Sequence, residues 1–377
     1  MIFASQPNIL SETEHIPRAL SQVSQLASIS KISYLHIQMH NKTAYIISFL
    51  NSLTIRKCLN ILKVYFSYYS SRLTGKISHR GMPFSLAVEP TNLCNLKCPQ
   101  CPSGMDLLSR KKGNIGTELY EKIMDELSPY LMHLTLYFQG EPFLNPDLTK
   151  LISIAKNKKI ITAISTNGHF LTEDNCEKII TAGLDRIIIS MDGLDQKTYE
   201  KYRVNGDFQK VVDGIKTLVD KRKKLKKSNP FIELQFLVFN HNEHQIIDFR
   251  KFAKYYGADS AKIKTAQIYN PDSNSEMIPS SDKYSRYKKD NQGKYQIKSS
   301  LKNHCFRMWS SAVVLHDGRV SPCCFDKDAT FVLGDLNDST FGKIFKSDEY
   351  NKFRNSVFSE RKNIEMCCNC TEGLKTR

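Results

Sequence analysis

From residue 84 onward, short apolar runs alternate with longer amphipathic segments. The apolar runs have the length and β-branched content of buried strands, and they cover residues 84–89, 134–138, 161–165, 186–191, 231–239 and 261–268. Between them, apolar residues recur at helical spacing over 117–127, 147–157, 173–182, 208–225 and 243–256. Thr117 and Thr172 are predicted N-caps, and Gly183 and Gly257 are predicted helix ends.

This alternation predicts a parallel sheet whose strands are joined by right-handed helical crossovers. Six strand–helix units make an open, partial version of the eight-unit barrel. The predicted fold class is therefore α/β, a partial (β/α)6 TIM-like barrel. In such barrels the functional side chains lie at the carboxyl ends of the strands. Residues that follow each predicted strand are thus the candidates for chemistry.

The first 80 residues are predicted to form a helical extension. Residues 43–73 have the composition of one or two helices, and Ile55, Leu59, Leu62 and Phe66 recur on one face. This face is open to two interpretations, an interfacial helix on an anionic membrane or a helix packed on the body of the protein. Packing is favoured because apolar faces in globular proteins usually meet a core. Residues 1–40 lack a firm period and are predicted to be poorly ordered or loosely docked.

Composition and charge narrow the class of protein. Hydrophobic residues make up 41% of the 377 residues, which is typical of a globular chain. The net charge of +16 fits an anionic small molecule, a membrane surface, an acidic peptide or nucleic acid, but lysines spread over solvated faces are the favoured explanation. No basic run is interleaved with aromatic residues, so no nucleic-acid partner is expected. Neither a signal peptide nor a membrane-spanning apolar run is present in the sequence, so a cytoplasmic location is expected.

Eleven cysteines, which fall in clusters, indicate metal ligation in a reducing compartment rather than disulfides. Cys94, Cys98 and Cys101 follow the first predicted strand at the spacing C-x3-C-x2-C. Asn and Pro residues around them favour a loop, in which three thiolates can face one cluster. Because a cubane has four irons, three cysteines would leave one iron open. Zinc binding or simple packing is the alternative.

A second set of cysteines lies near the C-terminus, beside a predicted hairpin of residues 312–315 and 319–321 with an Asp-Gly turn. Four thiolates from three places would close a cubane completely, and a structural zinc is the alternative. On spacing, the predicted ligands are Cys305, Cys323, Cys367 and Cys370, with Cys324 and Cys368 as neighbours that could replace two of them. The isolated Cys58 and Cys176 are predicted to be buried packing residues.

Polar residues follow the second, third and fourth predicted strands. Gly140 allows a ligand to approach the backbone, and Glu141 offers an anion to an ammonium group. Side chains suited to ribose hydroxyls come at Ser165, Thr166, Asn167, Ser190 and Asp192. Ordinary strand-to-helix turns would explain any one of these alone.

Weaker substrate candidates lie on or after the fifth and sixth strands. They are Gln235, Asn240, Lys264 and Gln267. His241 and His244, which lie close together after the fifth strand, are predicted to be solvated loop residues.

Taken in order, these motifs resemble those of the radical S-adenosylmethionine (radical SAM) superfamily. The three-cysteine loop is similar to its signature, although Gln100 stands where many members have an aromatic residue. Residues 139–142 resemble the family's G-G-E-P motif, with Gln139 in place of the first glycine. Residues 300–373 resemble a SPASM domain in a short version, with cysteines for a single auxiliary cluster.

The resemblance implies three cofactors: a [4Fe–4S] cluster on the three-cysteine loop, SAM chelated to its open iron, and one auxiliary [4Fe–4S] cluster. It implies that reduction splits SAM into methionine and a 5′-deoxyadenosyl radical, which abstracts hydrogen from a substrate in the barrel mouth. Gly140 and Glu141 would hold the SAM amino group. Arg203, with its bidentate fork, would hold the SAM carboxylate, and a surface ion pair is the alternative for it. An electron donor such as a flavodoxin or ferredoxin is the implied partner.

Two substrate classes stay open. A non-peptide metabolite (a sugar, lipid or nucleotide derivative) is favoured, because residues 1–80 show no strand pair for a peptide-recognition domain. A peptide side chain, as in maturases with SPASM domains, is the alternative. A non-catalytic module stabilised by zinc or a cluster is the alternative from another class. The predicted organisation is a helical extension (1–80), a barrel (81–268), a linker or substrate-side loop (269–299) and a cluster domain (300–377).

Overall fold

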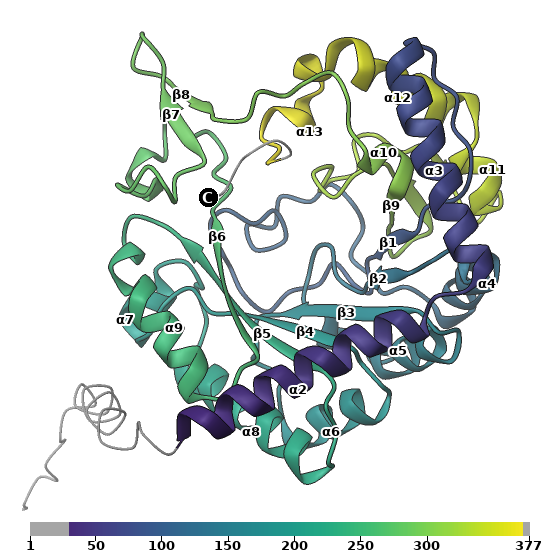
Figure 1. The fold of residues 1–377 in the computed structure, drawn as a ribbon. Coiled ribbons are helices and arrows are strands. Elements are labelled where there is room, and N and C mark those ends of the chain that lie inside the picture. The colour runs from purple at the N-terminus through teal and green to yellow at the C-terminus, as the bar shows by residue number, and fades with distance from the viewer. Residues whose placement is uncertain (1–29, 372–377) are drawn as a thin grey trace, which may run out of the picture.

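The structure, a computed structural model, describes residues 30–371 of the chain. A nine-stranded sheet forms its centre, in the order β11-β10-β9-β1-β2-β3-β4-β5-β6 (Figure 1). Six of its strands are parallel and follow one another in sequence: β1 (Ser85–Val88), β2 (His133–Thr135), β3 (Ile161–Thr166), β4 (Arg186–Ser190), β5 (Phe231–Val238) and β6 (Ser260–Thr265). The predicted α/β partial barrel is confirmed.

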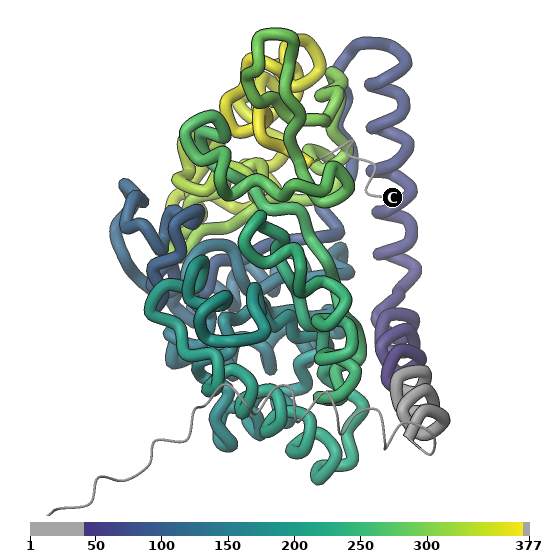
Figure 2. Tube along the Cα trace, turned by 90° about the vertical axis from the view of Figure 1, so that its left-hand side faces the viewer, coloured from purple at the N-terminus to yellow at the C-terminus, as the bar shows by residue number. Residues whose placement is uncertain are grey.

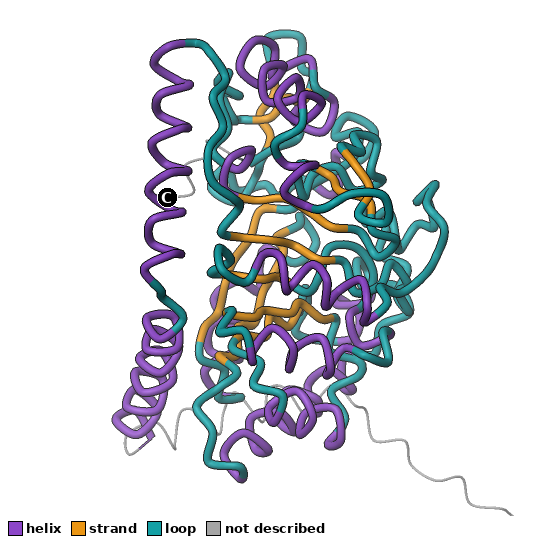
Figure 3. The backbone as a smooth tube through the Cα atoms, turned by 90° about the vertical axis from the view of Figure 1, so that its right-hand side faces the viewer, coloured by secondary structure: helices purple, strands orange, loops and turns teal. Residues whose placement is uncertain are grey.

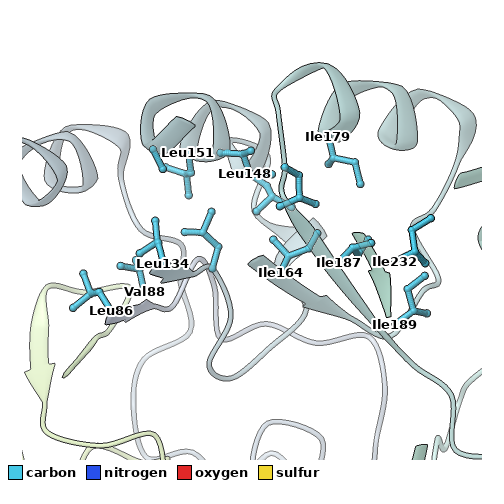
Figure 4. Packing of buried hydrophobic residues seen from close by; sticks show 14 of the residues in the cluster. Leu86, Val88, Leu134, Leu148, Leu151, Ile164, Ile179, Ile187, Ile189 and Ile232 are labelled. Carbon is cyan, nitrogen blue, oxygen red and sulfur yellow. The ribbon is translucent and has the colours of Figure 1, made fainter. Parts of the chain in front are cut away.

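Helices cover the outer face of these strands. They are α4 (Thr117–Leu127), α5 (Leu148–Asn157), α6 (Glu173–Thr181), α8 (Phe208–Lys224) and α9 (Ile246–Tyr255). Because side chains alternate along a strand, Ile187 and Ile189 of β4 pack under the helices with Ile164 and Leu151 (Figure 4). Burial of each such side chain stabilises the fold by about 1.5–3 kcal/mol. The opposite faces of the strands line the barrel interior.

Local signals set most of the helix boundaries. Thr172 caps α6 by accepting a hydrogen bond from Asn175 N, and Gly183 and Gly257 follow α6 and α9 with φ values of 85° and 75°. The prediction of Thr117 as an N-cap is wrong. Thr117 is the first residue of α4, and Gly116, which has no side chain to accept a hydrogen bond, precedes it.

The C-terminal segment extends the barrel sheet, which the sequence did not predict. β9 (Ser311–Val314) pairs in parallel with β1, and β10 (Arg319–Ser321) and β11 (Gly334–Asp335) follow as antiparallel strands. The turn between β9 and β10 uses Gly318 at a φ of 95°, so the predicted Asp-Gly hairpin is confirmed. This segment also contains the helices α10 (Arg307–Ser310), α11 (Phe341–Phe345), α12 (Asp348–Glu360), η5 (Arg361–Asn363) and α13 (Glu365–Cys368). The domain boundaries at 80, 268 and 299 stay predictions.

Glu89, directly after β1, joins the barrel to the C-terminal segment. Its carboxylate accepts hydrogen bonds from Nη1 and Nη2 of Arg110 at 2.7 and 2.8 Å, and it lies 2.9 Å from Nδ1 of His316. Glu89 and Arg110 are both buried. Burial favours the neutral acid, but the hydrogen bonds from Arg110 and His316 outweigh it, so the pKa of Glu89 lies below its usual value.

Residues 269–299, predicted to be a linker or loop, contain a short helix, η4 (Ser275–Met277), and a hairpin of β7 (Tyr287–Lys289) and β8 (Tyr295–Ile297). The hairpin projects at the upper left of Figure 1. Its base is anchored at Tyr287, whose hydroxyl accepts a hydrogen bond from Ile268 N and donates one to Asn369 Oδ1, both at 2.8 Å. The segment therefore bridges the end of the barrel and the C-terminal segment.

Two helices, α2 (Ser30–Asn51) and α3 (Ile55–Thr74), lie one after the other on one side of the molecule (Figures 2 and 3) and meet at a steep angle (Figure 1). They cross the amino ends of the strands. Hydrogen bonds join them to residues just before β6, β4, β3 and β1: Asn41 to Asp259, Ser48 to Asp185, Lys57 to Lys159 and Asn60 to Met82. The two helices thus close the end of the barrel opposite to the end where the strands deliver their functional residues.

The apolar stripe of α3 faces solvent rather than the barrel. Ile55 and Phe66 are 81% and 68% exposed, and Leu59 and Leu62 lie on the same outer face. The prediction that this face packs on the body is therefore wrong. Cys58 is exposed as well, contrary to the prediction, whereas Cys176 is buried as predicted.

Residues 30–40, predicted to be poorly ordered or loosely docked, belong to helix α2, and residues 1–29 lie outside the described part of the chain. Within residues 30–371, none of the helices combines the length and the apolar character needed to cross a bilayer.

Candidate functional site

The three-cysteine loop begins where β1 ends and packs against the segment that follows β2. Gly140 in that segment has a φ of 76°, and a Cβ atom there would come within 2.6 Å of the carbonyl oxygens of Thr91 and Leu93. Glu141 N donates a hydrogen bond to Leu93 O at 2.7 Å. Only glycine fits this close backbone contact, and the contact places the cysteines beside the carboxyl ends of the neighbouring strands.

The loop and the strand ends enclose a pocket of about 140 Å³. Most of the residues predicted around the first cluster and SAM line this pocket: Cys94, Cys98, Cys101, Gly140, Glu141, Ser165, Asn167, Ser190 and Arg203. The other two, Thr166 and Asp192, do not line it, but they hydrogen-bond Glu141 and Arg203. The structure therefore brings all the predicted residues of this site together.

Glu141 is a buried carboxylate held in a fixed orientation. Thr166 Oγ1 donates to its Oε1 at 2.7 Å, and Asn167 N donates to its Oε2 at 2.8 Å. Burial raises the pKa of Glu141 to about 7, although these hydrogen bonds favour the charged form. A cation in the pocket would favour the charged form further, so the site suits an ammonium group.

Arg203 lies inside the protein. Its Nε and Nη2 lie 2.7 and 2.6 Å from Asp192 Oδ2, and Asp192 Oδ1 accepts a hydrogen bond from Leu237 N at 2.7 Å. Its Nη1 is 3.8 Å from Cys98 Sγ. Arg203 and Asp192 have side-chain exposures of only 13% and 0%, so the alternative of a surface ion pair is wrong. Asp192 thus binds the Nε and Nη2 edge of the guanidinium and fixes its orientation in the pocket.

The donor chemistry of the pocket fits an iron–sulfur cluster. Burial raises the pKa of the Cys94 thiol to about 11 and also raises that of Cys98, so a free thiol there would keep its proton at neutral pH, whereas a bound metal deprotonates it. The described residues hold no group of three or more His, Cys, Asp or Glu side chains arranged to bind a single metal ion. A cubane places each cysteine on a different iron, so its ligands need not meet at one point.

Three of the four predicted auxiliary ligands, Cys305, Cys367 and Cys370, lie near Arg361. Cys305, Cys323 and Cys367 pack in one hydrophobic cluster, and Nη2 of Arg361 is 3.5 Å from Cys370 Sγ. The Nε of Arg361 is buried and has no hydrogen-bond partner among the described residues. A guanidinium with an unused N–H donor beside three of these thiols suits an anionic cluster.

The two neighbouring cysteines are both exposed, unlike most of the predicted auxiliary ligands. Cys368 Sγ lies 3.2 Å from Lys362 O, and Cys324 Sγ lies 3.7 Å from Nη1 of Arg307. This arrangement favours the ligand set chosen on spacing.

The barrel interior is polar and mainly cationic. Lys264 of β6 lies near Lys262, Arg186, Arg307 and Glu233. Burial and the neighbouring cations lower the pKa of Lys264, and the charge of Glu233 opposes them. Glu233 forms an ion pair with Nη2 of Arg186 at 2.8 Å. Besides the Arg186–Glu233 pair, three exposed cations, Lys262, Lys264 and Arg307, border this interior, so it favours an anionic ligand.

A second cavity, of about 290 Å³, lies between the cysteine loop, the end of β6 and the C-terminal segment. Pro102, Gln267, Tyr269, Lys327 and Met366 are among its lining residues. Lys327 Nζ lies 5.1 Å from the centroid of the Tyr269 ring. A molecule bound here would touch both cysteine-bearing parts of the chain.

The weaker sequence candidates separate into three groups. Gln267 lines the second cavity, and Gln235 shares the inward face of β5 with Glu233. Asn240 is exposed and lines neither cavity. His244 is exposed, as predicted, but His241 is half-buried with its ring stacked on Phe239 at 5.6 Å, so its prediction as a solvated residue is wrong.

Sequence reasoning missed four lining residues of the first pocket, namely Leu96, Gly104, Tyr137 and Phe138. A Cβ atom on Gly104 would come within 2.6 Å of Cys98 N, so this glycine lets the loop fold back on itself. Gln139, at the departure from the G-G-E-P pattern, accepts a hydrogen bond from Ser103 Oγ at 3.2 Å. Gln100, at the other departure, accepts one from Tyr269 N at 2.7 Å and so ties the cysteine loop to the end of β6.

Two family models match the chain. The model of the radical SAM superfamily matches residues 88–253, and that of an iron–sulfur cluster-binding domain, SPASM, matches residues 305–371. The chain belongs to the radical SAM superfamily. Its radical SAM domain implies a [4Fe–4S] cluster and SAM, and its SPASM domain implies auxiliary iron–sulfur ligation, in agreement with the two cysteine sets.

Curated relatives of this radical SAM protein are enzymes of differing activity. The chain is 26% identical over 238 residues to the AdoMet-dependent heme synthase of Methanosarcina barkeri, a match that covers 62% of this chain and 66% of that protein. It is 26% identical over 191 residues to the PqqA peptide cyclase of Gluconobacter oxydans, covering 50% of each chain. The matched regions span half to two thirds of these relatives.

Solved structures of radical SAM enzymes share the fold. SuiB of Streptococcus suis bound to S-adenosylmethionine has a TM-score of 0.56 at 15% identity, with 83% of this chain and 77% of that chain covered. BtrN in complex with AdoMet and 2-DOIA has a TM-score of 0.50 at 19% identity, with 77% and 93% covered. At these identities the likeness concerns the fold alone.

Proposed function

We propose that this radical SAM protein is an enzyme that cleaves SAM reductively and abstracts hydrogen from a non-peptide metabolite bearing an anionic group. The observation that carries the proposal is the enclosure of three thiols, one carboxylate and one guanidinium in a single pocket at the carboxyl ends of the strands. When bound there, the cluster and SAM supply the radical chemistry.

In this proposal the protein's own residues bind SAM and fix its orientation. Glu141 accepts hydrogen bonds from the ammonium group of SAM, and Thr166 holds Glu141 in place. Arg203, oriented by Asp192, contacts the SAM carboxylate. Ribose hydroxyls pair with polar groups that line the pocket, such as Asn167 and Ser190. The burial of these groups keeps water from the reacting centre.

The excess of cations in the barrel interior supports an anionic metabolite as the substrate. The cavity of about 290 Å³ is near the lower end of the range of small-molecule sites. All the regular structure described before β1, within residues 30–84, is helical, and it closes the far end of the barrel rather than forming a peptide-recognition domain.

A peptide is the second candidate substrate, and the position of β6 at the edge of the sheet favours it. An extended peptide can add to such an edge through main-chain hydrogen bonds. The two candidates differ in their recognition chemistry, because the interior cations bind a small anion whereas an edge strand binds backbone groups.

Reconstituted, oxygen-free protein tests the proposal. We expect about eight irons and eight sulfides per chain, as two cubanes require, and formation of 5′-deoxyadenosine from SAM under dithionite. A small-molecule extract should stimulate SAM cleavage, and passage over an anion-exchange resin should remove the stimulating fraction. Stimulation by a peptide fraction would support the second candidate instead. Bound zinc without iron, and no deoxyadenosine, would identify a non-catalytic binding module.

Replacement of Glu141 by Gln tests the proposed contact with the SAM ammonium. The amide keeps the shape of the side chain but removes its charge, so we expect SAM binding to weaken by roughly 10- to 100-fold, or about 1.5–3 kcal/mol. Equilibrium dialysis with the reconstituted protein measures this affinity.

The matched control for this variant is Glu173→Gln, which changes an exposed carboxylate on α6. Equal SAM affinity in E141Q and wild type, with equal iron content, would remove Glu141 from the binding site.

A further inference from the structure

The outer face of α3 is apolar over its whole length. Its apolar side chains recur every three or four residues, and each exposes between 50% and 87% of its surface: Ile55, Leu59, Leu62, Phe66, Tyr69 and Leu73. A surface helix normally turns such a stripe toward the core. Contiguous apolar surface of this kind marks an interaction site.

The inner face of α3 is mostly polar, with Val64 and Tyr68 packed in a hydrophobic cluster, and its polar side chains are hydrogen-bonded. Asn60 donates to Met82 O and accepts from Met82 N, both at 2.8 Å. Lys57 Nζ donates to Lys159 O at 2.9 Å, and Ser71 Oγ accepts from Ser78 N at 2.9 Å. These bonds fix the rotation of the helix, because turning the apolar stripe inward would break them and leave polar groups unpaired.

The preceding helix, α2, continues the apolar surface with Ile46, Ile47, Phe49 and Leu50, each at least 42% exposed. The two helices lie on the same side of the molecule (Figures 2 and 3), at a steep angle to each other (Figure 1). With 22 and 20 residues at about 1.5 Å per residue, each helix is about 30 Å long. We call this surface the α2–α3 face.

Neither helix of this face contains an acidic residue. Between His15 and Val88 the sequence contains nine Lys and Arg residues and no Asp or Glu. Arg56, Lys63 and Arg72 are exposed beside the apolar stripe of α3. An apolar helix face flanked by cations is the pattern of a helix that lies in a bilayer interface.

We propose that the α2–α3 face binds an anionic membrane surface, with its apolar side chains at headgroup depth and its cations at the lipid phosphates. Because the face covers the amino ends of the strands, the bound protein holds its cysteine pocket away from the bilayer. The proposal is independent of SAM cleavage.

A second copy of the chain fits this face less well. A twofold contact between identical faces would bring Arg56, Lys63 and Arg72 of one copy against the same cations of the other. Without an acidic residue on the face to pair with them, this juxtaposition is repulsive. Anionic headgroups provide the complementary charge.

Sedimentation of the full-length chain with lipid vesicles tests the proposal. We expect binding to vesicles rich in phosphatidylglycerol to exceed binding to pure phosphatidylcholine by at least about tenfold, and to fall as salt is raised. The double variant Leu62→Gln/Phe66→Gln should lower binding to anionic vesicles by at least about tenfold. Both residues are exposed, so the variant should keep its fold.

The matched control places the same change on another exposed apolar pair, Ile247→Gln/Tyr255→Gln on α9, and it should bind vesicles as wild type does. A Phe66→Trp variant gives a second readout. Its tryptophan emission should shift to the blue with anionic vesicles, whereas the buried Trp309 gives a constant background.

Three results would overturn the proposal: wild-type protein that does not bind anionic vesicles, a double variant that binds them as tightly as wild type, or an emission unchanged by lipid. A wild-type oligomer that the double variant converts to monomers, without vesicle binding, would assign the face to contacts between copies.

Discussion

Replacement of Cys98 by Ala is expected to lower the rate of 5′-deoxyadenosine formation by about 10³-fold or more, which corresponds to roughly 4 kcal/mol of barrier. Cys98 is buried in the first pocket, beside Arg203 and between the other two thiols of its loop. Two thiolates are too few to hold a cubane on this loop. Iron content should fall by about half, because the auxiliary cysteines are unchanged. Chromatographic assay of deoxyadenosine and iron analysis measure both effects.

The control for this variant is Cys58→Ala, which also removes one cysteine but from an exposed position on α3. It should keep both iron content and SAM cleavage. If the Cys98→Ala protein cleaved SAM at the wild-type rate, the three-cysteine loop would not be the site of the chemistry.

The Glu89→Gln variant is expected to lose about 3–5 kcal/mol of unfolding free energy. The amide leaves the buried Arg110 guanidinium without its counter-charge and weakens the contact with His316. The loss of stability should affect both the barrel and the C-terminal segment, because Glu89 follows β1 and His316 follows β9. Denaturant unfolding followed by fluorescence of Trp309, the single tryptophan, measures the loss.

A matched carboxylate-to-amide control is Asp248→Asn, which removes an exposed ion pair with Lys251 and should cost less than about 1 kcal/mol. The pH dependence gives a further check. Since the pKa of Glu89 is lowered by folding, its contribution is complete above the unfolded value of about 4.5 and is lost as the pH falls through the folded value. The stabilities of E89Q and wild type should therefore converge in acid, and a constant difference would contradict the assignment.

Much of the barrel could be predicted from the sequence because its strands and helices are set by local patterns. The helix Thr117–Leu127 was predicted with its observed bounds, and the strand ends that carry Glu141, Asn167 and Ser190 were found from short polar motifs. Parallel strands joined by helices bring these motifs to one edge, so the composition of the pocket followed from the order of the motifs.

The features that escaped prediction depend on contacts distant in sequence. The sequence of β9 predicts a strand of a hairpin, but it does not show that this strand joins the barrel sheet. Its parallel pairing with β1 is established only in the folded structure. The orientation of α3 is a second case. The helical period of its apolar residues is clear in the sequence. The apolar side faces solvent, however, because Lys57 and Asn60 on the opposite side form hydrogen bonds with Lys159 and Met82. The partners of Glu89 escaped for the same reason, because His316 lies far along the chain.

The place of β9 between β1 and β10 also bears on how the protein is made. Ser85 faces Ser311, so a ribosome must add more than 200 residues after β1 before that strand receives its second neighbour. At ordinary translation speeds this takes on the order of tens of seconds, during which a nascent chain presents an unpaired strand edge next to three bare thiols. The residues that line the first pocket all lie between Cys94 and Arg203, so they are made before β9. Slower growth at low temperature lengthens the period in which chaperones must shield the open edge of β1.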